Sequence, residues 1–280
     1  MNGIETMLTK HDWFDTNLRQ RFIDKSIDLN YIINPYRFKS MTFDEATDLT
    51  CEQLLNMNKQ IFVSFSGGYD SEYVLRSLHS NFIDAIPLIV ECSITEETKY
   101  AHEVCKELQL DPILIKISEN DFLNFVEENI VNKFDGIGYN SAYGMIAAEY
   151  VSKIHNSILV SGNHFLGDGF ELITDEDIFI AHDWDFYIDY FLKDSVNVNF
   201  FIYNIEMVYS CIPEHHTTWA MFKHKKFNLK VRNKMRYRYT YEMKNKLSEL
   251  LRKIKYPNKK IEVVWSKEKF YTYFNKYKEI

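Results

Sequence analysis

The sequence predicts an α/β protein: a parallel sheet covered by helices on both faces, with a helical N-terminal lead-in and a helical C-terminal portion. Two observations lead to this prediction. Short apolar runs alternate with helical patterns through the middle of the chain, and these runs lack the polar alternation of half-exposed strands. Glycines gather just after some of these runs, where a parallel sheet collects its ligands. The predicted domains are 1–57 for the lead-in, 58–185 for the sheet and 186–280 for the C-terminal portion.

The expected elements follow in order along the chain. Thr42 and Glu45 have the capping-box spacing that begins a helix before the sheet. Apolar and β-branched residues predict strands at 61–65, 86–91, 112–117 and 157–161. Helical periodicity predicts helices at 70–80, 96–110, 119–132 and 141–154. Beyond residue 185 aromatic residues recur at roughly helical spacing, and a last helix is expected from 244 until Pro257 ends it.

Glycine is rare in this chain and concentrated in three places. The chain has 9 Gly in 280 residues, and all but Gly3 fall at 67–68, 136–144 and 162–169. Glycine is used where a backbone turns sharply or lets another group approach closely. We therefore expect the three places to be walls of one site.

The first of these places has the sequence Ser-Gly-Gly-Tyr-Asp-Ser, residues 66–71, between a predicted strand and a predicted helix. The N–H groups of such a turn, with the positive end of the helix dipole, favour phosphate. Ser66 and Ser71 add hydroxyl donors. A carboxylate repels phosphate, so Asp70 fits here if it caps the helix or holds Mg²⁺. The alternative is a tight Gly-Gly turn before an ordinary helix.

This glycine loop (residues 66–71) resembles the SGGxDS loop of the PP-loop ATP pyrophosphatases, the N-type family with a Rossmann-like, adenine nucleotide α-hydrolase-like fold. GMP synthetase, NAD synthetase, asparagine synthetase and tRNA-lysidine synthetase are members. The matching residues are Ser66, Gly67, Gly68, Asp70 and Ser71, and the resemblance spans about residues 58–185. It implies that the loop, Tyr69 included, binds the β,γ-pyrophosphate of ATP with Mg²⁺. An acceptor oxygen would attack the α-phosphate, and an amine, ammonia or sulfur nucleophile would then displace AMP.

A second polar loop follows the predicted strand 157–161. Gly162 begins it, and His164, Asp168 and Glu171 follow, the last two at D-x-x-E spacing. Relatives carry acidic residues at this sheet edge, so the resemblance implies that Gly162 borders the nucleotide and that Asp168 helps to hold Mg²⁺. The alternative is a polar loop that caps the next element. The catalytic residues implied in this way are Asp70, Ser71 and Asp168, and the metal ligands are Asp70 and Asp168.

Other residues are assigned by the resemblance alone. Val90, with Glu91 and Cys92 at the end of the second predicted strand, is expected beside adenine. Lys225 and Arg232 are expected at the phosphates of ATP or at a nucleic-acid backbone. The loop 134–144 should lie at the same sheet edge, as a substrate or adenine loop or as a plain connection.

The formal net charge of −7 conceals a basic segment (residues 222–260). This segment holds 15 Lys and Arg against 2 Glu, a net charge of +13 on an otherwise acidic chain. Such a segment predicts contact with phosphate, in ATP or in tRNA or DNA. The alternative is a solvated helix that pairs with the acidic body.

Composition excludes several classes. No apolar run approaches the length of a membrane span, and the N-terminus has neither the basic nor the apolar part of a signal peptide. The 4 Cys include no CxxC pair, which predicts a cytoplasmic protein without a disulfide framework, structural zinc or an iron–sulfur cluster. Position 2 is Asn rather than the Cys of a glutaminase, and the residues before the predicted strand 61–65 leave no room for a glutaminase domain. The resemblance therefore implies that any ammonia comes from solution or from a partner.

Together these features predict an ATP-dependent adenylating enzyme, an AMP-forming C–N ligase that activates a carbonyl-type oxygen of a small molecule or nucleobase. Two alternatives stay open. One is a lysidine-synthetase-like enzyme that modifies tRNA or DNA bases. The other is a nucleotide-binding regulatory module that has lost catalysis. The sequence leaves open the acceptor, the nucleophile and the oligomeric state, a homo-oligomer included.

Overall fold

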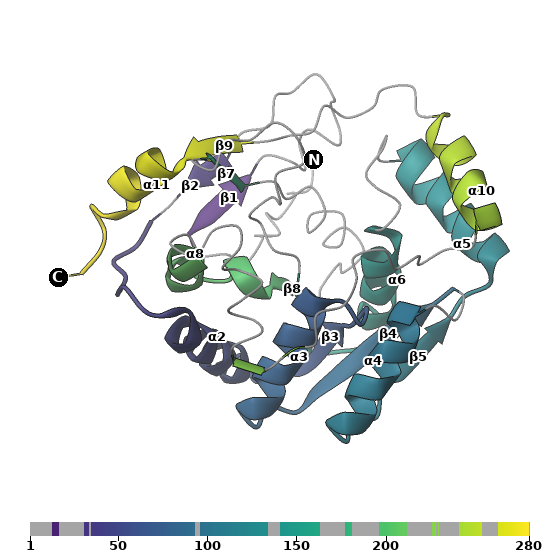
Figure 1. Ribbon diagram of the computed structural model, residues 1–280, viewed down its shortest axis with the longest axis horizontal. Coiled ribbons are helices and arrows are strands. Elements are labelled where there is room, and N and C mark those ends of the chain that lie inside the picture. The colour runs from purple at the N-terminus through teal and green to yellow at the C-terminus, as the bar shows by residue number, and fades with distance from the viewer. Residues whose placement is uncertain are drawn as a thin grey trace, which may run out of the picture.

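The computed structural model of the chain is an α/β structure with helices on both faces of a central sheet (Figure 1). It describes residues 13–16, 31–33, 35–92, 96–133, 141–162, 177–180, 196–211, 226–227, 229, 241–253 and 263–279. None of the helices in these ranges has the length and hydropathy that crossing a lipid bilayer requires.

The central sheet has five parallel strands in the order β5-β4-β3-β6-β8. Their bounds are Gln60–Ser64 for β3, Ala85–Glu91 for β4, Ile113–Lys116 for β5, Ser157–Ser161 for β6 and Val196–Asn199 for β8. The chain starts in the middle at β3, adds β4 and β5 on one side, and then crosses to β6 and β8 on the other. The sheet is therefore doubly wound, and its strand order reverses between β3 and β6.

The inner strands β3, β4 and β6 are mostly buried on both faces, as their apolar sequences predict, whereas the edge strand β5 leaves Leu114 and Lys116 exposed. Ile61 and Val63 of β3 enter the main core with α3 (Tyr69–Ser80) and α4 (Glu96–Glu107). Phe62 points to the opposite face, where it packs with Ala147 and Ala148 of α6 (Ser141–Val151). This alternation along β3 gives the two faces separate cores.

The helix before the sheet, α2 (Phe43–Asn56), begins as predicted. Thr42 is its N-cap, and its hydroxyl accepts from the Glu45 N–H at 3.3 Å. The Thr42 N–H donates in return to the Glu45 carboxylate at 2.8 Å. This reciprocal pair is the capping box that the sequence indicates.

The predicted helix 119–132 consists of two parts, α5 (Glu119–Phe125) and a π-helix, η1 (Val126–Lys133). Helix α10 (Tyr241–Leu251) packs against them, and its Met243 and Leu247 share a buried cluster with Phe122 and Val126. The predicted helix 244–257 thus starts earlier than expected.

The expectation that residues 186–280 are helical is wrong at two strands, β8 and β9 (Val263–Ser266). β8 supplies the fifth strand of the central sheet, and β9 pairs with β7 (Asp177–Ile180) in an antiparallel ribbon. β8 reads Val-Asn-Val-Asn and is too short to outweigh the helical spacing of the aromatic residues around it. The helical elements described after β8 are η2 (Phe200–Ile202), α8 (Ile205–Cys211), α10 and α11 (Lys267–Phe274).

The expectation of a mostly helical lead-in also needs correction. β1 (Phe14–Thr16) and β2 (Tyr31–Ile33) form an antiparallel pair. Each strand has three residues, too few to show the alternation of apolar and polar residues that predicts a strand. The hydrogen bonds that form the pair join residues 14–16 to residues 31–33. Trp13, beside β1, is 1% exposed and donates its indole N–H to the Ile202 carbonyl at 2.8 Å. The lead-in therefore packs against the chain that follows β8.

Candidate functional site

The glycine loop lies at the carboxyl edge of the sheet, between β3 and α3 (Figure 1). Gly67 has φ of 81°, in the left-handed region that favours glycine. Gly68 is the N-cap of α3 and supplies no side-chain cap. No side chain at the N-cap therefore competes with a ligand for the first N–H groups of α3, which favour an anion.

Two serine hydroxyls join the ends of this loop. Ser66 Oγ lies 3.2 Å from Ser71 Oγ, and Ser66 Oγ also accepts from the Gly68 N–H at 3.2 Å. The Ser71 hydroxyl donates to the Gly68 carbonyl at 3.1 Å. Because a hydroxyl can rotate to donate elsewhere, both serines are suited to meet the oxygen of a ligand.

The end of β6 reaches the start of α3 at Gly162. A Cβ on Gly162 would lie 2.9 Å from the carbonyl carbon of Asp70 and 3.0 Å from the Ser71 nitrogen. Such distances exclude a side chain, so glycine lets the two backbones meet. The structure thus brings together Gly162, Asp70 and Ser71, which the sequence singled out in two separate motifs. Their meeting point is where the strand order reverses, the place at which doubly wound sheets bind ligands.

Asp70 and Glu72 place two carboxylates in the first turn of α3. The Glu72 side chain is 2% exposed, and its Oε1 accepts from Arg76 Nε at 3.0 Å. The guanidinium charge compensates the buried Glu72 carboxylate. Asp70 is half-buried in the same turn. Magnesium commonly takes one or two protein carboxylates together with substrate phosphates, and Asp70 beside a phosphate-binding loop fits this donor set. Within the described ranges no cluster of three or more His, Cys, Asp or Glu could hold a metal by itself.

The end of β4 borders the loop on the side opposite to β6. Val90 packs in the apolar clusters beneath α6 and α10. Glu91 Oε1 lies 2.6 Å from Nε2 of His102 on α4. Cys92 Sγ lies 3.9 Å from the Met243 sulfur, and burial raises the pKa of the Cys92 thiol to about 11. Cys92 is therefore a thiol at neutral pH and a poor nucleophile.

Several predicted site residues lie outside the described residues. They are Asp168, Lys225 and Arg232, together with His164 and Glu171. Residues 134–140 of the predicted substrate loop lie outside them as well. The roles of these residues stay predictions.

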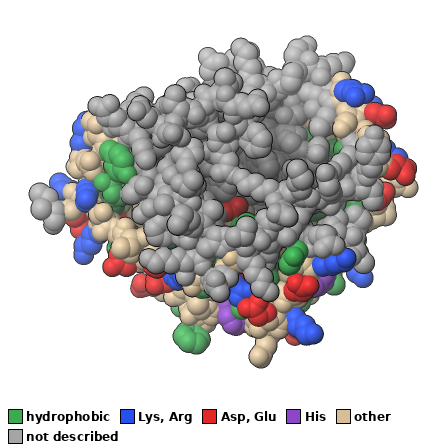
Figure 2. All heavy atoms as spheres, in the orientation of Figure 1, with side chains coloured by type: hydrophobic (Ala, Val, Ile, Leu, Met, Phe, Trp, Pro, Cys, Tyr) green, Lys and Arg blue, Asp and Glu red, His purple; other side chains and the backbone are tan. Residues whose placement is uncertain are grey.

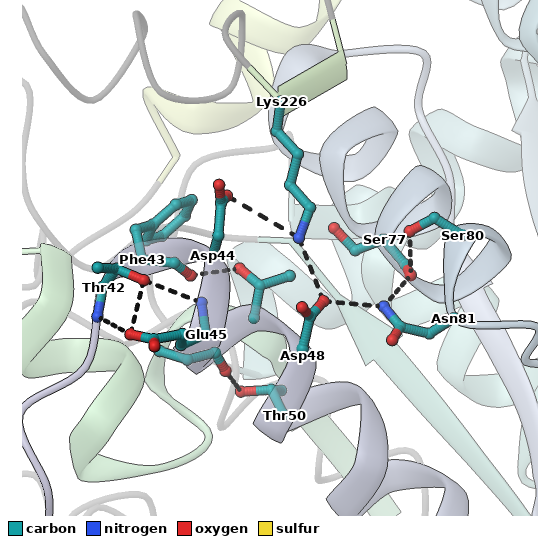
Figure 3. A network of polar contacts seen from close by, with 12 residues as sticks. Thr42, Phe43, Asp44, Glu45, Asp48, Thr50, Ser77, Ser80, Asn81 and Lys226 are labelled. Carbon is teal, nitrogen blue, oxygen red and sulfur yellow. Dashed lines mark hydrogen bonds and ion pairs between the residues drawn. The ribbon is translucent and has the colours of Figure 1, made fainter.

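Lys226 of the basic segment docks on α2 (Figure 3). Lys226 Nζ lies 3.2 Å from Asp48 Oδ1 and 3.9 Å from Asp44 Oδ1, both on α2. The Phe227 ring meets the Tyr73 ring of α3 edge to face, with centroids 5.3 Å apart. The sequence reasoning missed this contact. Helical periodicity marks Tyr73 as a core residue, but nothing in the sequence names its partner.

Tyr73 joins several elements behind the loop. It is fully buried, and its hydroxyl lies 2.8 Å from Thr47 Oγ1 of α2. Its ring also contacts the rings of Phe43, Phe200 and Phe201. The helix that begins at the glycine loop is therefore fastened to α2, to the chain after β8 and to the basic segment.

Two further cations of the basic segment also pair with carboxylates. Lys253 Nζ donates to Glu127 Oε1 of η1 at 2.6 Å, and Lys246 pairs with Glu242 within α10 at 2.9 Å. On the face shown in Figure 2, the described acidic and basic side chains are interspersed. Lys226 and Lys253 thus pair with the acidic body, whereas the Lys246 pair lies within the basic segment itself.

Comparison with known proteins gives matches among solved structures. No family model matches the chain, and no curated protein matches it. A protein described as a predicted subunit of tRNA methyltransferase from Methanocaldococcus jannaschii is 15% identical, with a TM-score of 0.43 over 72% of this chain and 94% of that one. A U34-tRNA thiolase from Methanococcus maripaludis is 13% identical, with a TM-score of 0.43 over 74% and 72%. An NH3-dependent NAD synthetase from Campylobacter jejuni is 13% identical, with a TM-score of 0.37 over 78% and 96%. The functional argument accordingly stands on the glycine loop and its neighbours.

Proposed function

We propose that the chain is an ATP-dependent adenylating enzyme that forms AMP and pyrophosphate, as its resemblance to the PP-loop ATP pyrophosphatases implies. One observation carries the proposal. The SGGYDS sequence lies between a parallel strand and a helix, with Gly67 in the left-handed region and Gly162 against the backbone of Asp70. This arrangement combines features that bind a polyphosphate: a glycine turn, a helix N-terminus and glycines that bring no side chain of their own to it.

In the proposed reaction the glycine loop binds the β- and γ-phosphates. An acceptor oxygen attacks the α-phosphorus, the bond from that phosphorus to the bridging oxygen breaks, and pyrophosphate leaves. N–H groups and the hydroxyls of Ser66 and Ser71 stabilise the charge that grows on the leaving pyrophosphate. Asp70 would hold Mg²⁺, with Asp168 as its predicted partner, and the ion when bound neutralises phosphate charge.

The second step displaces AMP from the adenylated acceptor. An amine or ammonia attacks the activated carbon, the carbon–oxygen bond to AMP breaks, and the nucleophile loses a proton to solvent. Burial raises the pKa of Cys51 and of Cys105 to about 12, and that of Cys92 to about 11. These three thiols stay protonated at neutral pH, which favours a nitrogen nucleophile over sulfur carried on one of them.

The acceptor is proposed to be a small molecule or a free nucleobase. A base of tRNA or DNA is the second candidate, because the basic segment has a net charge of +13. Against it, Lys226, Lys246 and Lys253 each pair with a carboxylate. Nucleic-acid binding that weakens steeply with salt would favour the second candidate, and no binding at low salt would eliminate it.

The test follows the fate of ATP labelled at the α-phosphate. The protein is incubated with Mg²⁺ and ATP, alone and with pools of metabolites, ammonia and tRNA. AMP and pyrophosphate are expected with one pool only, and Asp70→Asn should abolish them. Asp84→Asn is the matched control, because Asp84 is exposed at the opposite edge of the sheet.

Two outcomes would contradict the proposal. ADP and phosphate as the products would mean that the loop serves another reaction. ATP binding without any product, from every pool, would favour the regulatory module instead.

A further inference from the structure

We infer that Glu91, oriented by His102, binds the 2′-hydroxyl of the nucleotide ribose and makes the site selective for ribonucleotides. The inference rests on the proposed function, because it takes ATP as the ligand of the glycine loop. It assigns a role to two residues that the adenylating reaction does not otherwise use.

Glu91 has the right place in the fold. It is the last residue of β4, the strand that follows the glycine loop along the chain. Ser64 of β3 lies opposite Leu88 of β4, so the same register continued by three residues would bring Gly67 level with Glu91. Neighbouring strands lie about 4.8 Å apart. A nucleotide whose phosphates occupy the loop can therefore reach the end of β4 with its nucleoside.

The same position carries a ribose ligand in other doubly wound nucleotide-binding sheets. In dinucleotide-binding folds an acidic residue about 20 residues after the Gly-rich turn hydrogen-bonds the ribose 2′-hydroxyl. Glu91 follows Gly68 at about this spacing and stands at the end of the next strand. A carboxylate repels phosphate, so this position suits the sugar better than the triphosphate.

The Glu91 carboxylate is already held in place to accept a hydrogen bond from a ligand. Its Oε1 lies 2.6 Å from His102 Nε2, and its side chain is 11% exposed while that of His102 is 39% exposed. An ionised carboxylate only accepts, so the imidazole N–H donates to it and fixes its direction. Because a carboxylate has about four acceptor positions, it can accept a hydroxyl as well. The Glu91 carbonyl also accepts from the Ile117 N–H at 2.9 Å, which holds the backbone in place.

Helices α3 and α4 keep this pair at a fixed place relative to the loop. Arg76 of α3 donates to both carboxylate oxygens of Glu107 on α4, at 2.9 and 2.8 Å. Bidentate pairs of this kind are geometrically specific. The helix that starts at the glycine loop is thus tied to the helix that carries His102. A nucleotide that contacts both the glycine loop and Glu91 would therefore meet two groups that need no rearrangement before binding.

The alternative is that Glu91 and His102 only fasten α4 to β4. Equilibrium binding of Mg-ATP and Mg-2′-deoxy-ATP separates the two roles, with the dissociation constants measured for the wild type, Glu91→Ala, Glu91→Gln and His102→Ala. Glu103→Gln is the matched control, because Glu103 is an exposed carboxylate on the same helix. Thermal unfolding of each variant checks that it is folded.

The wild type is expected to bind ATP about 10- to 100-fold tighter than 2′-deoxy-ATP, the range for a hydrogen bond to a charged group. Glu91→Ala should weaken ATP binding by that factor and leave 2′-deoxy-ATP unchanged, so that the ratio approaches one. Glu91→Gln and His102→Ala should give intermediate ratios, and Glu103→Gln should keep the wild-type ratio.

Equal affinities in the wild type, or an unchanged ratio in Glu91→Ala and Glu91→Gln, would overturn the ribose role while leaving the adenylating function intact. Equal weakening of both nucleotides would also overturn it, because that result describes a structural role. A folded wild type that binds neither nucleotide would instead refute the proposed function itself.

Discussion

The two edges of the central sheet use the same unusual backbone conformation in different ways. Among the described residues, each non-glycine residue with positive φ stands at the amino edge, between a helix and the strand that follows it: Asn58, Phe82, Gln109 and Asn156, with φ from 52 to 57°. At the carboxyl edge the described residue with positive φ is Gly67, at 81°. The amino edge therefore has side chains at its positive-φ turns, whereas at the carboxyl edge the described positive-φ position is a glycine.

Hydrogen bonds explain the amino edge. The Gln60 N–H donates to the Asn156 carbonyl at 3.0 Å, and the Asn156 side chain donates to the Asn58 carbonyl at 3.1 Å. These turns satisfy their polar groups within the protein. At the carboxyl edge, Gly67, Gly68 and Gly162 bring no side chain of their own to the start of α3, and the Gly68 N–H donates to the Ser66 hydroxyl at 3.2 Å. The comparison teaches that the turns of the amino edge close the fold, and under the proposed function the carboxyl edge admits the nucleotide.

The largest effect is expected at Gly162. In Gly162→Ala the added Cβ would lie 2.9 Å from the backbone of Asp70, so strand and helix must separate. We expect the free energy of unfolding to fall by about 1–3 kcal/mol. ATP binding should weaken more than tenfold, on the order of 1.4 kcal/mol. Chemical denaturation and nucleotide titration measure the two effects.

Gly68→Ala is the matched control for this change. Gly68 has an extended backbone, and among the described residues an added Cβ would meet the hydroxyl oxygen of Ser66, at 3.2 Å. The Ser66 side chain can rotate away, so stability should change little. Equal loss of stability in the two variants would contradict the close approach at Gly162.

An intermediate effect is expected at Gly67. Gly67→Ala should lower the free energy of unfolding by about 1–2 kcal/mol, because an L-residue is strained in the left-handed region. Gly67→Asn should lower it less, because Asn tolerates this conformation. Both variants should weaken ATP binding, since either side chain enters the loop. If Asn and Ala destabilise equally, backbone strain is not the reason for glycine here.

The smallest effect is expected at the amino edge, and with the opposite sign. Phe82 has φ of 57° and is 98% exposed, so Phe82→Gly removes strain without losing packing. The free energy of unfolding should rise by about 1 kcal/mol, with ATP affinity unchanged. Phe82→Ala keeps the strain and should leave stability near the wild type. A fall in ATP affinity for Phe82→Gly would contradict the claim that the amino edge takes no part in nucleotide binding.

Local sequence was sufficient for the strand, turn and helix around the glycine loop and for the start of α2, and insufficient for contacts between distant elements. Ser-Gly-Gly-Tyr-Asp-Ser after an apolar run indicates strand, loop and helix, because each of its residues has a local conformational reason to be there. Gly162 was noticed, but its contact with the Asp70 backbone depends on the pairing of β3 with β6. β8 was missed, because a four-residue edge strand takes its stability from its neighbour rather than from its own pattern.

The described part of the basic segment shows the same limit. Its charge was read correctly, yet the sequence could not decide between phosphate and carboxylate partners. Lys226 meets Asp48, a residue far away along the chain, and Phe227 meets Tyr73. Contacts of this kind come from tertiary packing, which local propensity does not encode.

Amide hydrogen exchange with and without an ATP analogue that resists cleavage between the α- and β-phosphates tests the central claim most directly. With Mg²⁺ present, exchange should slow in residues 66–71, 90–92 and 161–162, at the carboxyl edge. The turns around Asn58, Phe82, Gln109 and Asn156 should exchange as before. Protection at those turns, or none in the glycine loop at saturating analogue, would contradict the assignment of the carboxyl edge as the nucleotide site.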